Sequence, residues 1–187
     1  MTLRLFIAIE IGEGEKKSLE RIQSRLRHKL TAVKWVNPAA IHLTLRFLGD
    51  NDEREVPRIL DAIAAAAAES VAFSFTMRGV GAFPNARSPR VIWIGVEEPT
   101  GILVRLAAAL NALLSSAGFS AEDRPFSPHI TIGRVKERGG PDFGPVLSLF
   151  RDEAAGVTHA REVCLIRSEL TTSGPVHTVL HRMPLKG

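Results

Sequence analysis

Two short stretches of the chain share a pattern of histidine and threonine that suits acid–base chemistry. They are IHLTLRFLGD, residues 41–50, and SPHITIGRV, residues 127–135, and each places His-x-Thr within alternating apolar residues. For a chain with six His and ten Thr, chance gives roughly 0.3 such pairs. The repeat therefore indicates a single site that is built from two copies of one motif.

The first motif has the alternation of a half-buried strand. Side chains at positions i and i+2 of a strand point to the same face, and the residues between them point to the opposite face. We therefore expect one polar face and one face packed on the core. The polar face carries His42, Thr44 and Arg46, and the core face carries Leu43, Leu45 and Phe47.

The second motif repeats this arrangement, with His129 and Thr131 on the polar face. Arg134 has the parity of the buried isoleucines, so simple alternation turns it away from that face. A twist or a bulge must intervene if Arg134 binds a substrate. Because Phe47 borders the first motif, stacking on a nucleobase is an alternative to plain packing at that position.

Two opposed imidazoles suit the in-line cleavage of a phosphodiester. One ring takes a proton from the attacking oxygen and the other gives a proton to the leaving oxygen. Histidine serves both roles near neutral pH because its ordinary pKa is about 6.5. The hydroxyls of Thr44 and Thr131 are candidates to donate to non-bridging phosphate oxygens, and Arg46 and Arg134 are candidates to add positive charge.

The order of the predicted elements repeats along the chain. Strands at residues 3–11 and 90–97 each lead to a helix, at residues 16–30 and 101–118, and then to one of the two motifs. Leu5 precedes His42 by 37 positions and Val91 precedes His129 by 38. We therefore predict an internal duplication, with two lobes related by a pseudo-two-fold axis, since the period is too long for a solenoid.

Composition indicates an ordinary globular protein. The chain has 187 residues, 45% hydrophobic and 24% charged, with a net charge of +4. This charge permits an acidic partner but is too small to indicate binding along a duplex. A single cysteine, Cys164, favours a reducing compartment. Arg4 and Glu10 interrupt the apolar N-terminus, and no apolar run approaches ~18 residues. We therefore expect a cytoplasmic protein that makes no membrane contact.

Other candidate residues have simpler interpretations. His177 and His181 are four residues apart, but this stretch is typical of a strand, where that spacing corresponds to roughly 13 Å. A metal site is therefore not expected there. Cys164 lacks a visible base and is interpreted as a core residue. Ser168, near the end of a strand, is a weak candidate to line the substrate site.

At the two motifs the sequence resembles the RNA 2′,3′-cyclic phosphodiesterases, historically called 2′-5′ RNA ligases, of the two-histidine phosphoesterase superfamily. The likeness extends over nearly the whole chain. It includes RLFIAIE, KWVNPAAIHLTLRFLGD, GVGAFPNARSPRVIWIGVE, RPFSPHITIGRV and CLIRSEL. The resemblance implies that residues 1–187 form a single bilobal α+β domain. It also implies two antiparallel sheets around a central cleft, with helices on the outer faces.

The resemblance further implies the roles of the motif residues. His42 would act as proton donor and His129 as proton acceptor, with Thr44 and Thr131 on the phosphate and no metal or nucleotide cofactor. Water would open a 2′,3′-cyclic phosphate to a 2′-phosphomonoester. The substrates would be RNA ends or small 2′,3′-cyclic nucleotides, and no obligate protein partner is indicated. One departure is Gly133, where relatives often carry a side chain, which affects the expected geometry at Arg134.

Two alternatives remain open at the level of sequence. Ligation of a 2′,3′-cyclic end to a 5′-hydroxyl uses the same groups in the reverse reaction. A non-catalytic module that binds RNA ends or nucleotides would also keep the two motifs. The near-symmetry of the halves does not itself distinguish the acid from the base.

Overall fold

The elements follow the expected order closely. The computed structural model describes residues 1–122, 124–136, 142–172 and 174–187. The strands are β1 (Thr2–Glu10), β2 (Val33–Trp35), β3 (His42–Asp52), β4 (Phe73–Phe83), β5 (Val91–Glu97), β6 (His129–Val135), β7 (Ala154–Ala160), β8 (Glu162–Thr171) and β9 (Gly174–Pro184). The helices are α1 (Glu13–Arg27), α2 (Val56–Ala68), α3 (Ile102–Ser116) and α4 (Gly144–Ser148), with short 3-10 turns η1 (Pro38–Ala40) and η2 (Glu53–Glu55).

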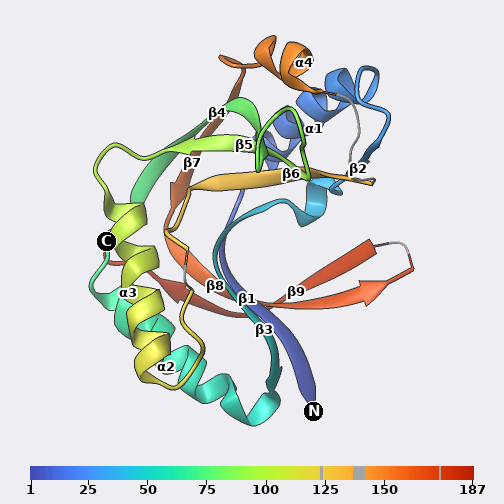
Figure 1. The fold of residues 1–187 in the computed structure, drawn as a ribbon. Helices are drawn as coiled ribbons and strands as arrows, with labels where there is room; N and C mark the ends of the chain where they lie inside the picture. Colours follow the sequence, from blue (N-terminus) through green and yellow to red (C-terminus); the bar gives the residue numbers. More distant parts are fainter. Residues whose placement is uncertain (123, 137–141, 173) are drawn as a thin grey trace.

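The strands form two antiparallel sheets (Figure 1). One has the order β3-β1-β8-β9 and the other the order β2-β6-β5-β4-β7. In each sheet a motif strand lies beside the first strand of its own half, and the next strand comes from the other half of the chain. β8 joins the first sheet and β4 joins the second. The predicted α+β fold, with two antiparallel sheets and related halves, is confirmed.

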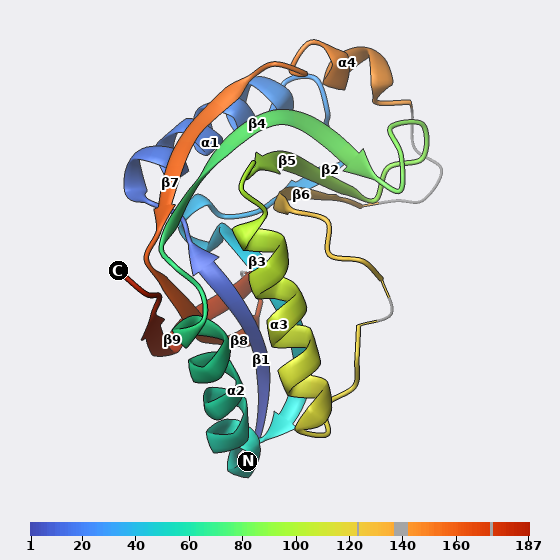
Figure 2. The ribbon, with the colours of Figure 1, turned by 90° about the vertical axis from the view of Figure 1, so that its left-hand side faces the viewer.

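Helices cover the outer faces of both sheets (Figure 2). α2 packs against α3, and this pair contacts β3, β8 and β9 of the first sheet. α1 packs against β7, and α4 packs against β4. Pro57 lies in the first turn of α2, where its missing N–H costs no helical hydrogen bond. No helix in the described ranges has both the length and the apolar character needed to cross a membrane.

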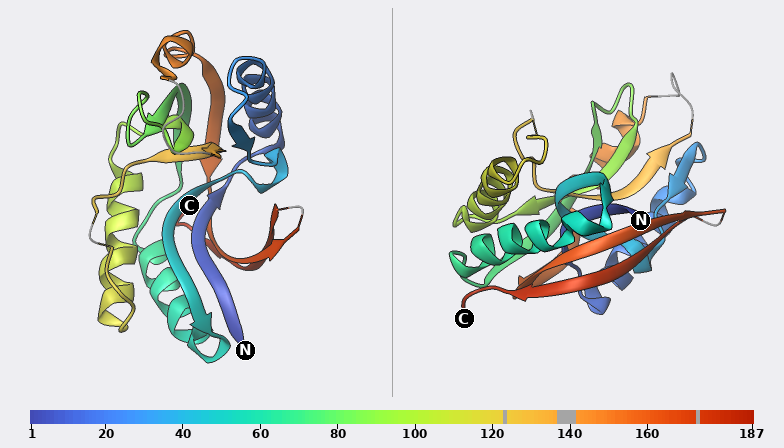
Figure 3. Two further views of the ribbon diagram at one scale, coloured as in Figure 1. Left: turned by 45° about the vertical axis from the view of Figure 1, so that its right-hand side comes forward. Right: turned by 90° about the horizontal axis from the view of Figure 1, so that it is seen from below.

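One hydrophobic core joins the sheets and helices. Leu5, Ile7 and Ile9, at alternate positions of β1, belong to this core and are almost fully buried. On the opposite side of that sheet a smaller cluster contains Phe6, Ala8, Cys164 and Ile166. The β8–β9 hairpin curves strongly away from the helices (Figure 3). The first sheet is therefore packed on its outer face and leaves its inner face for other contacts.

A buried glutamine connects the two motif regions. Gln23 of α1 is only 1% exposed. Its Nε2 donates to the carbonyl of Val36, just before η1, at 2.8 Å, and to the carbonyl of Ile132 in β6 at 2.9 Å. The amide of Val36 also donates to the Ile132 carbonyl, at 3.0 Å. These bonds fix the segment that enters the first motif to the strand that carries the second.

We predict that Gln23→Ala lowers the free energy of unfolding by about 1–3 kcal/mol, because the Val36 carbonyl loses the Gln23 donor and the Ile132 carbonyl keeps only the bond from the Val36 amide. Glu20→Ala is the matched control, since Glu20 lies on the same helix and is exposed. Urea denaturation of both variants measures the effect. Equal stability of the two variants would show that the Gln23 bonds contribute nothing.

Candidate active site

His42 is held in one tautomer by the turn that precedes β3. Asn37 caps η1 by accepting a hydrogen bond from the amide of Ala39. The carbonyl of Ala40 then lies 2.8 Å from His42 Nδ1. A carbonyl only accepts hydrogen bonds, so the Nδ1 atom carries the proton. His42 Nε2 is therefore the nitrogen that is left to exchange protons with a substrate.

His129 is held in the same way. Its Nδ1 lies 2.7 Å from the carbonyl of Ser127, again two residues earlier. Phe83 packs edge-on against the His129 ring with the centroids 4.9 Å apart. Both motif histidines thus have a protonated Nδ1 and an Nε2 with a free lone pair. β3 and β6, which carry them, are in contact although they belong to different sheets.

A bulge follows the first motif and changes which residues share its face. Ala8 of β1 pairs with Thr44, but Ile7 pairs with Arg46, so Leu45 is the extra residue. A one-residue bulge reverses the alternation beyond it. We call the face of each sheet that carries the motif His and Thr its motif face.

The expected positions of Arg46 and Phe47 are wrong for this reason. Arg46 is 3% exposed, and its Nη2 donates to the carbonyl of Ser120 instead of facing His42. Burial lowers its pKa from the ordinary value. Phe47 is 60% exposed and pairs with Phe6 on the motif face. The bulge therefore removes the geometric basis for substrate contact by Arg46 and favours the stacking alternative for Phe47.

An equivalent bulge follows the second motif. Trp93 of β5 pairs with Thr131 and Ile92 pairs with Gly133, so Ile132 is the extra residue. Because of this bulge, Arg134 returns to the motif face. A role of Arg134 in substrate binding requires such a bulge.

The bulge also gives Gly133 a structural role. A Cβ atom at Gly133 would lie 2.6 Å from Val33 Cγ1 and 3.2 Å from the Trp35 ring. Glycine therefore allows β2 to approach β6 closely.

Among the described residues, no hydrogen bond engages the hydroxyl of Thr44 or of Thr131. Both side chains are partly exposed. Each lies two residues after its histidine and on the same face of the strand. The hydroxyls are thus free to donate to an anionic ligand near the imidazoles.

A third histidine, which sequence reasoning missed, lies beside His42. The rings of His177 on β9 and His42 meet edge to face with centroids 5.1 Å apart. Phe6 stacks on His42 at 4.6 Å and contacts His177 at 5.0 Å. Ser168, on β8, is the strand partner of His177 and has the parity of Ile166, so it lies on the motif face. Its candidate role in lining the site stays a prediction.

This aromatic environment changes the acidity of His42. Burial, together with the neighbouring His177, lowers the pKa of His42 from 6.5 to about 4, although the bond to the Ala40 carbonyl opposes the change. Burial also lowers the pKa of His177. In the free protein both rings are therefore neutral at pH 7.

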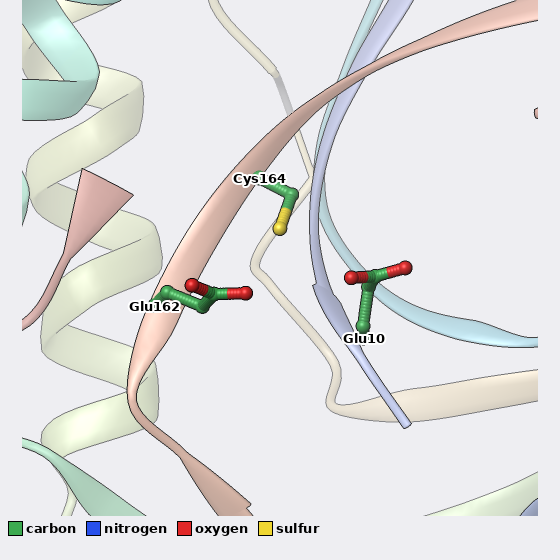
Figure 4. Close-up of side chains that lie close together, drawn as sticks. All are labelled: Glu10, Glu162 and Cys164. Atoms are coloured by element: carbon green, nitrogen blue, oxygen red, sulfur yellow. The ribbon is translucent and has the colours of Figure 1, made fainter. Parts of the chain in front are cut away.

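Metal-ligating side chains also gather on the motif face of this sheet, where Glu10 is the direct strand partner of His42 (Figure 4). Glu10 projects from β1, and Glu162 and Cys164 from β8, with ligand atoms within 4.8 Å of one another. Arg182 Nη1 already binds both carboxylates. Burial raises the pKa of the Cys164 thiol to about 12, which disfavours the thiolate that binds metals. This group is an ion-pair network and fits a metal poorly.

Comparison with known proteins places this fold and its paired motifs among the phosphoesterases. The model of the LigT-like phosphoesterase family matches two consecutive segments, residues 9–93 and 94–177, and each contains one motif. The chain belongs to this family. The double match agrees with the predicted duplication.

Relatives and a solved structure match over nearly the full length. Proteins named RNA 2′,3′-cyclic phosphodiesterase from Methanothermobacter thermautotrophicus and Thermotoga maritima are 36% and 37% identical. The matches cover 95% and 99% of this chain, and 96% and 97% of theirs. The crystal structure of TT0787 from Thermus thermophilus has a TM-score of 0.82 at 32% identity, covering 99% of each chain.

The lowered pKa of His42 predicts a pH-dependent stability. Below pH 6.5 the unfolded chain binds a proton at this residue, whereas the folded protein does not until about pH 4. The free energy of unfolding therefore decreases as the pH is lowered from 6.5 to about 4. In an NMR titration we expect the His42 ring to stay neutral down to about pH 5. A midpoint near 6.5 would contradict the proposed environment.

Proposed function

We propose that this protein hydrolyses RNA 2′,3′-cyclic phosphate ends to 2′-phosphomonoesters through His42 and His129, without a metal ion. The observation that carries the proposal is the matching restraint of two histidines by the carbonyls of Ala40 and Ser127. Both restraints leave Nε2 available for proton transfer. Membership in a phosphoesterase family and the names of full-length relatives support the substrate class.

The reaction follows from these groups. His129 Nε2 takes a proton from water, whose oxygen forms a bond to phosphorus as the P–O3′ bond breaks. His42 gives its proton to the departing O3′, and the phosphate remains on O2′. The hydroxyls of Thr44 and Thr131, together with Arg134, hold the non-bridging oxygens, where negative charge must be stabilised. Solvent then returns a proton to His42 and removes one from His129.

The donor role requires that His42 be protonated when the P–O3′ bond breaks. Its pKa of about 4 in the free protein keeps the ring neutral at pH 7. An anionic phosphate beside the ring stabilises the charged form and so raises the pKa. We therefore assign the charging of His42 to substrate binding.

The first test is incubation of the purified protein with a 2′,3′-cyclic nucleotide in EDTA, with identification of the product. We expect hydrolysis to a 2′-phosphomonoester. A strict requirement for metal, or a 3′-phosphate product, would refute the proposed mechanism. Tight product binding without turnover would instead indicate a non-catalytic module. Joining of a supplied 5′-hydroxyl RNA fragment would reveal the ligation alternative.

We predict that His42→Ala and His129→Ala each lower kcat by at least about a hundredfold, because each proton transfer contributes about 10²- to 10⁴-fold. Circular dichroism checks that both variants fold. The matched control is His28→Ala, since His28 is exposed at the end of α1. Activity of either motif variant within a few-fold of that control would exclude acid–base catalysis by that ring.

Phe47 offers a separate test of nucleobase stacking. Stacking of a base on an aromatic ring contributes about 1–3 kcal/mol, so Phe47→Ala should raise KM by roughly 5- to 150-fold with a small change in kcat. Leu149→Ala is the control because Leu149 is also a large exposed apolar residue, at 67%. An unchanged KM for Phe47→Ala, with Phe47→Trp also unchanged, would show that the ring does not contact the base.

A further inference from the structure

Three cations line the motif face of the second sheet beyond Thr131, and we call them the β6 stripe: Lys34, Arg134 and Lys136. Lys34 of β2 is the direct strand partner of Arg134. Lys136 follows two residues later, and its amide continues the ladder by donating to the carbonyl of Ala32 at 2.9 Å. All three side chains are exposed.

The bulge at Ile132 places this stripe on the same face as the second motif. Arg134 pairs with Val91, which has the parity of Trp93, the partner of Thr131. Lys34 shares that face because directly opposed residues of an antiparallel pair project to one side. Lys136 shares it by alternation. The stripe thus leads outward along β6 from His129 and Thr131, and Figure 1 shows β2 beside β6 at this end of the sheet.

These charges lack acidic partners within the described part of the chain. The ion pairs there involve Lys16, Arg25, Arg54, Arg58, Arg78, Arg167 and Arg182, and none includes a residue of the stripe. Like charges directly opposite each other on neighbouring strands are destabilising. Lys34 and Arg134 are such a pair, so a further phosphate bound beside Lys34 relieves their repulsion.

We propose that the β6 stripe binds the phosphodiester backbone of a single-stranded RNA whose terminal nucleotide occupies the two-histidine site. The inference rests on the proposed function and specifies its substrate as an oligonucleotide. Successive cations on one strand face are roughly 6.6 Å apart, a separation that suits the repeating phosphates of a single strand. An acidic peptide is a weaker match because the stripe is continuous with the motif residues.

The length of the stripe separates long substrates from short ones. At about 3.3 Å per residue, Lys136 lies roughly 15 Å along the strand from Thr131. A cyclic mononucleotide bound at Thr131 is too short to span that length, whereas an oligonucleotide brings further phosphates to the lysines. Removal of Lys34 and Lys136 therefore impairs only the longer substrate.

The test compares the Lys34→Ala/Lys136→Ala double variant with the unmodified protein on two substrates over a range of salt concentrations. The substrates are 2′,3′-cyclic UMP and an oligouridylate pentamer that ends in a 2′,3′-cyclic phosphate. We expect unchanged kcat/KM for the mononucleotide. For the pentamer we expect a loss of about tenfold at low salt, and a salt dependence whose logarithmic slope is smaller by about one to two.

The matched control is Lys17→Ala/Lys186→Ala, which removes the same charge from exposed sites elsewhere. If the control lowers pentamer activity as much as the stripe variant does, or if the stripe variant leaves it unchanged, the inference is wrong.

A binding measurement keeps the inference separate from catalysis. The pentamer ending in a 2′-phosphate, labelled with fluorescein, reports affinity by anisotropy even if no substrate is hydrolysed. Absence of hydrolysis of both substrates by the unmodified protein refutes the proposed function. If the unmodified protein and the stripe variant have equal pentamer affinity and equal salt slopes, RNA binding by the stripe is refuted, whatever the activity. Weaker pentamer binding by the stripe variant alone supports it.

Discussion

The site depends on a single extra residue in each motif strand. Leu45 and Ile132 interrupt the ladders of β3 and β6 three residues after the motif histidines. Because each bulge reverses the alternation, the fifth residue after each histidine returns to the motif face and the fourth turns to the core. The Ile132 carbonyl, on the other side of β6, accepts from the Val36 amide and from Gln23 Nε2. The bulges thus orient the side chains, and the bonds to Ile132 connect the two halves.

The two bulged motif strands have the same backbone arrangement but different side chains around their histidines. Phe47 and Arg134 occupy equivalent positions, and so do Arg46 and Gly133. The first half surrounds its histidine with Phe6 and His177, an environment that opposes a charge on the ring. The second half places cations beside its motif, where an anion is attracted. The halves therefore differ in electrostatics although they agree in backbone, and this difference breaks the near-symmetry that sequence alone leaves between the two histidines.

Local patterns in the sequence were sufficient to predict the two strand–helix–motif units and their duplication, since alternation and helical periodicity are properties of neighbouring positions. The bulges were not accessible in this way. Which residue is extra depends on the partner strand, so Arg46 was assigned to the wrong face and Arg134 needed a bulge that sequence could not locate. His177 was missed because β9 reaches His42 only through the order β3-β1-β8-β9 and the curvature of that sheet.

The segments that approach the motifs show why neither half forms the site alone. The residues before β3 include β2, which pairs with the free edge of β6. Ser120 and Glu122, which precede β6, contact β3: the Ser120 carbonyl accepts a hydrogen bond from Arg46, and Glu122 Oε1 lies 3.4 Å from the Phe47 amide. Each motif strand is thus contacted by residues that precede the other motif. An unpaired strand edge favours association with other chains. These reciprocal contacts therefore protect the motif strands and favour an arrangement in which the two halves stay together. Because each histidine strand contacts residues that precede the other, a displacement of one strand also shifts the residues that lead into the other. The contacts thus favour two motifs that move as one unit.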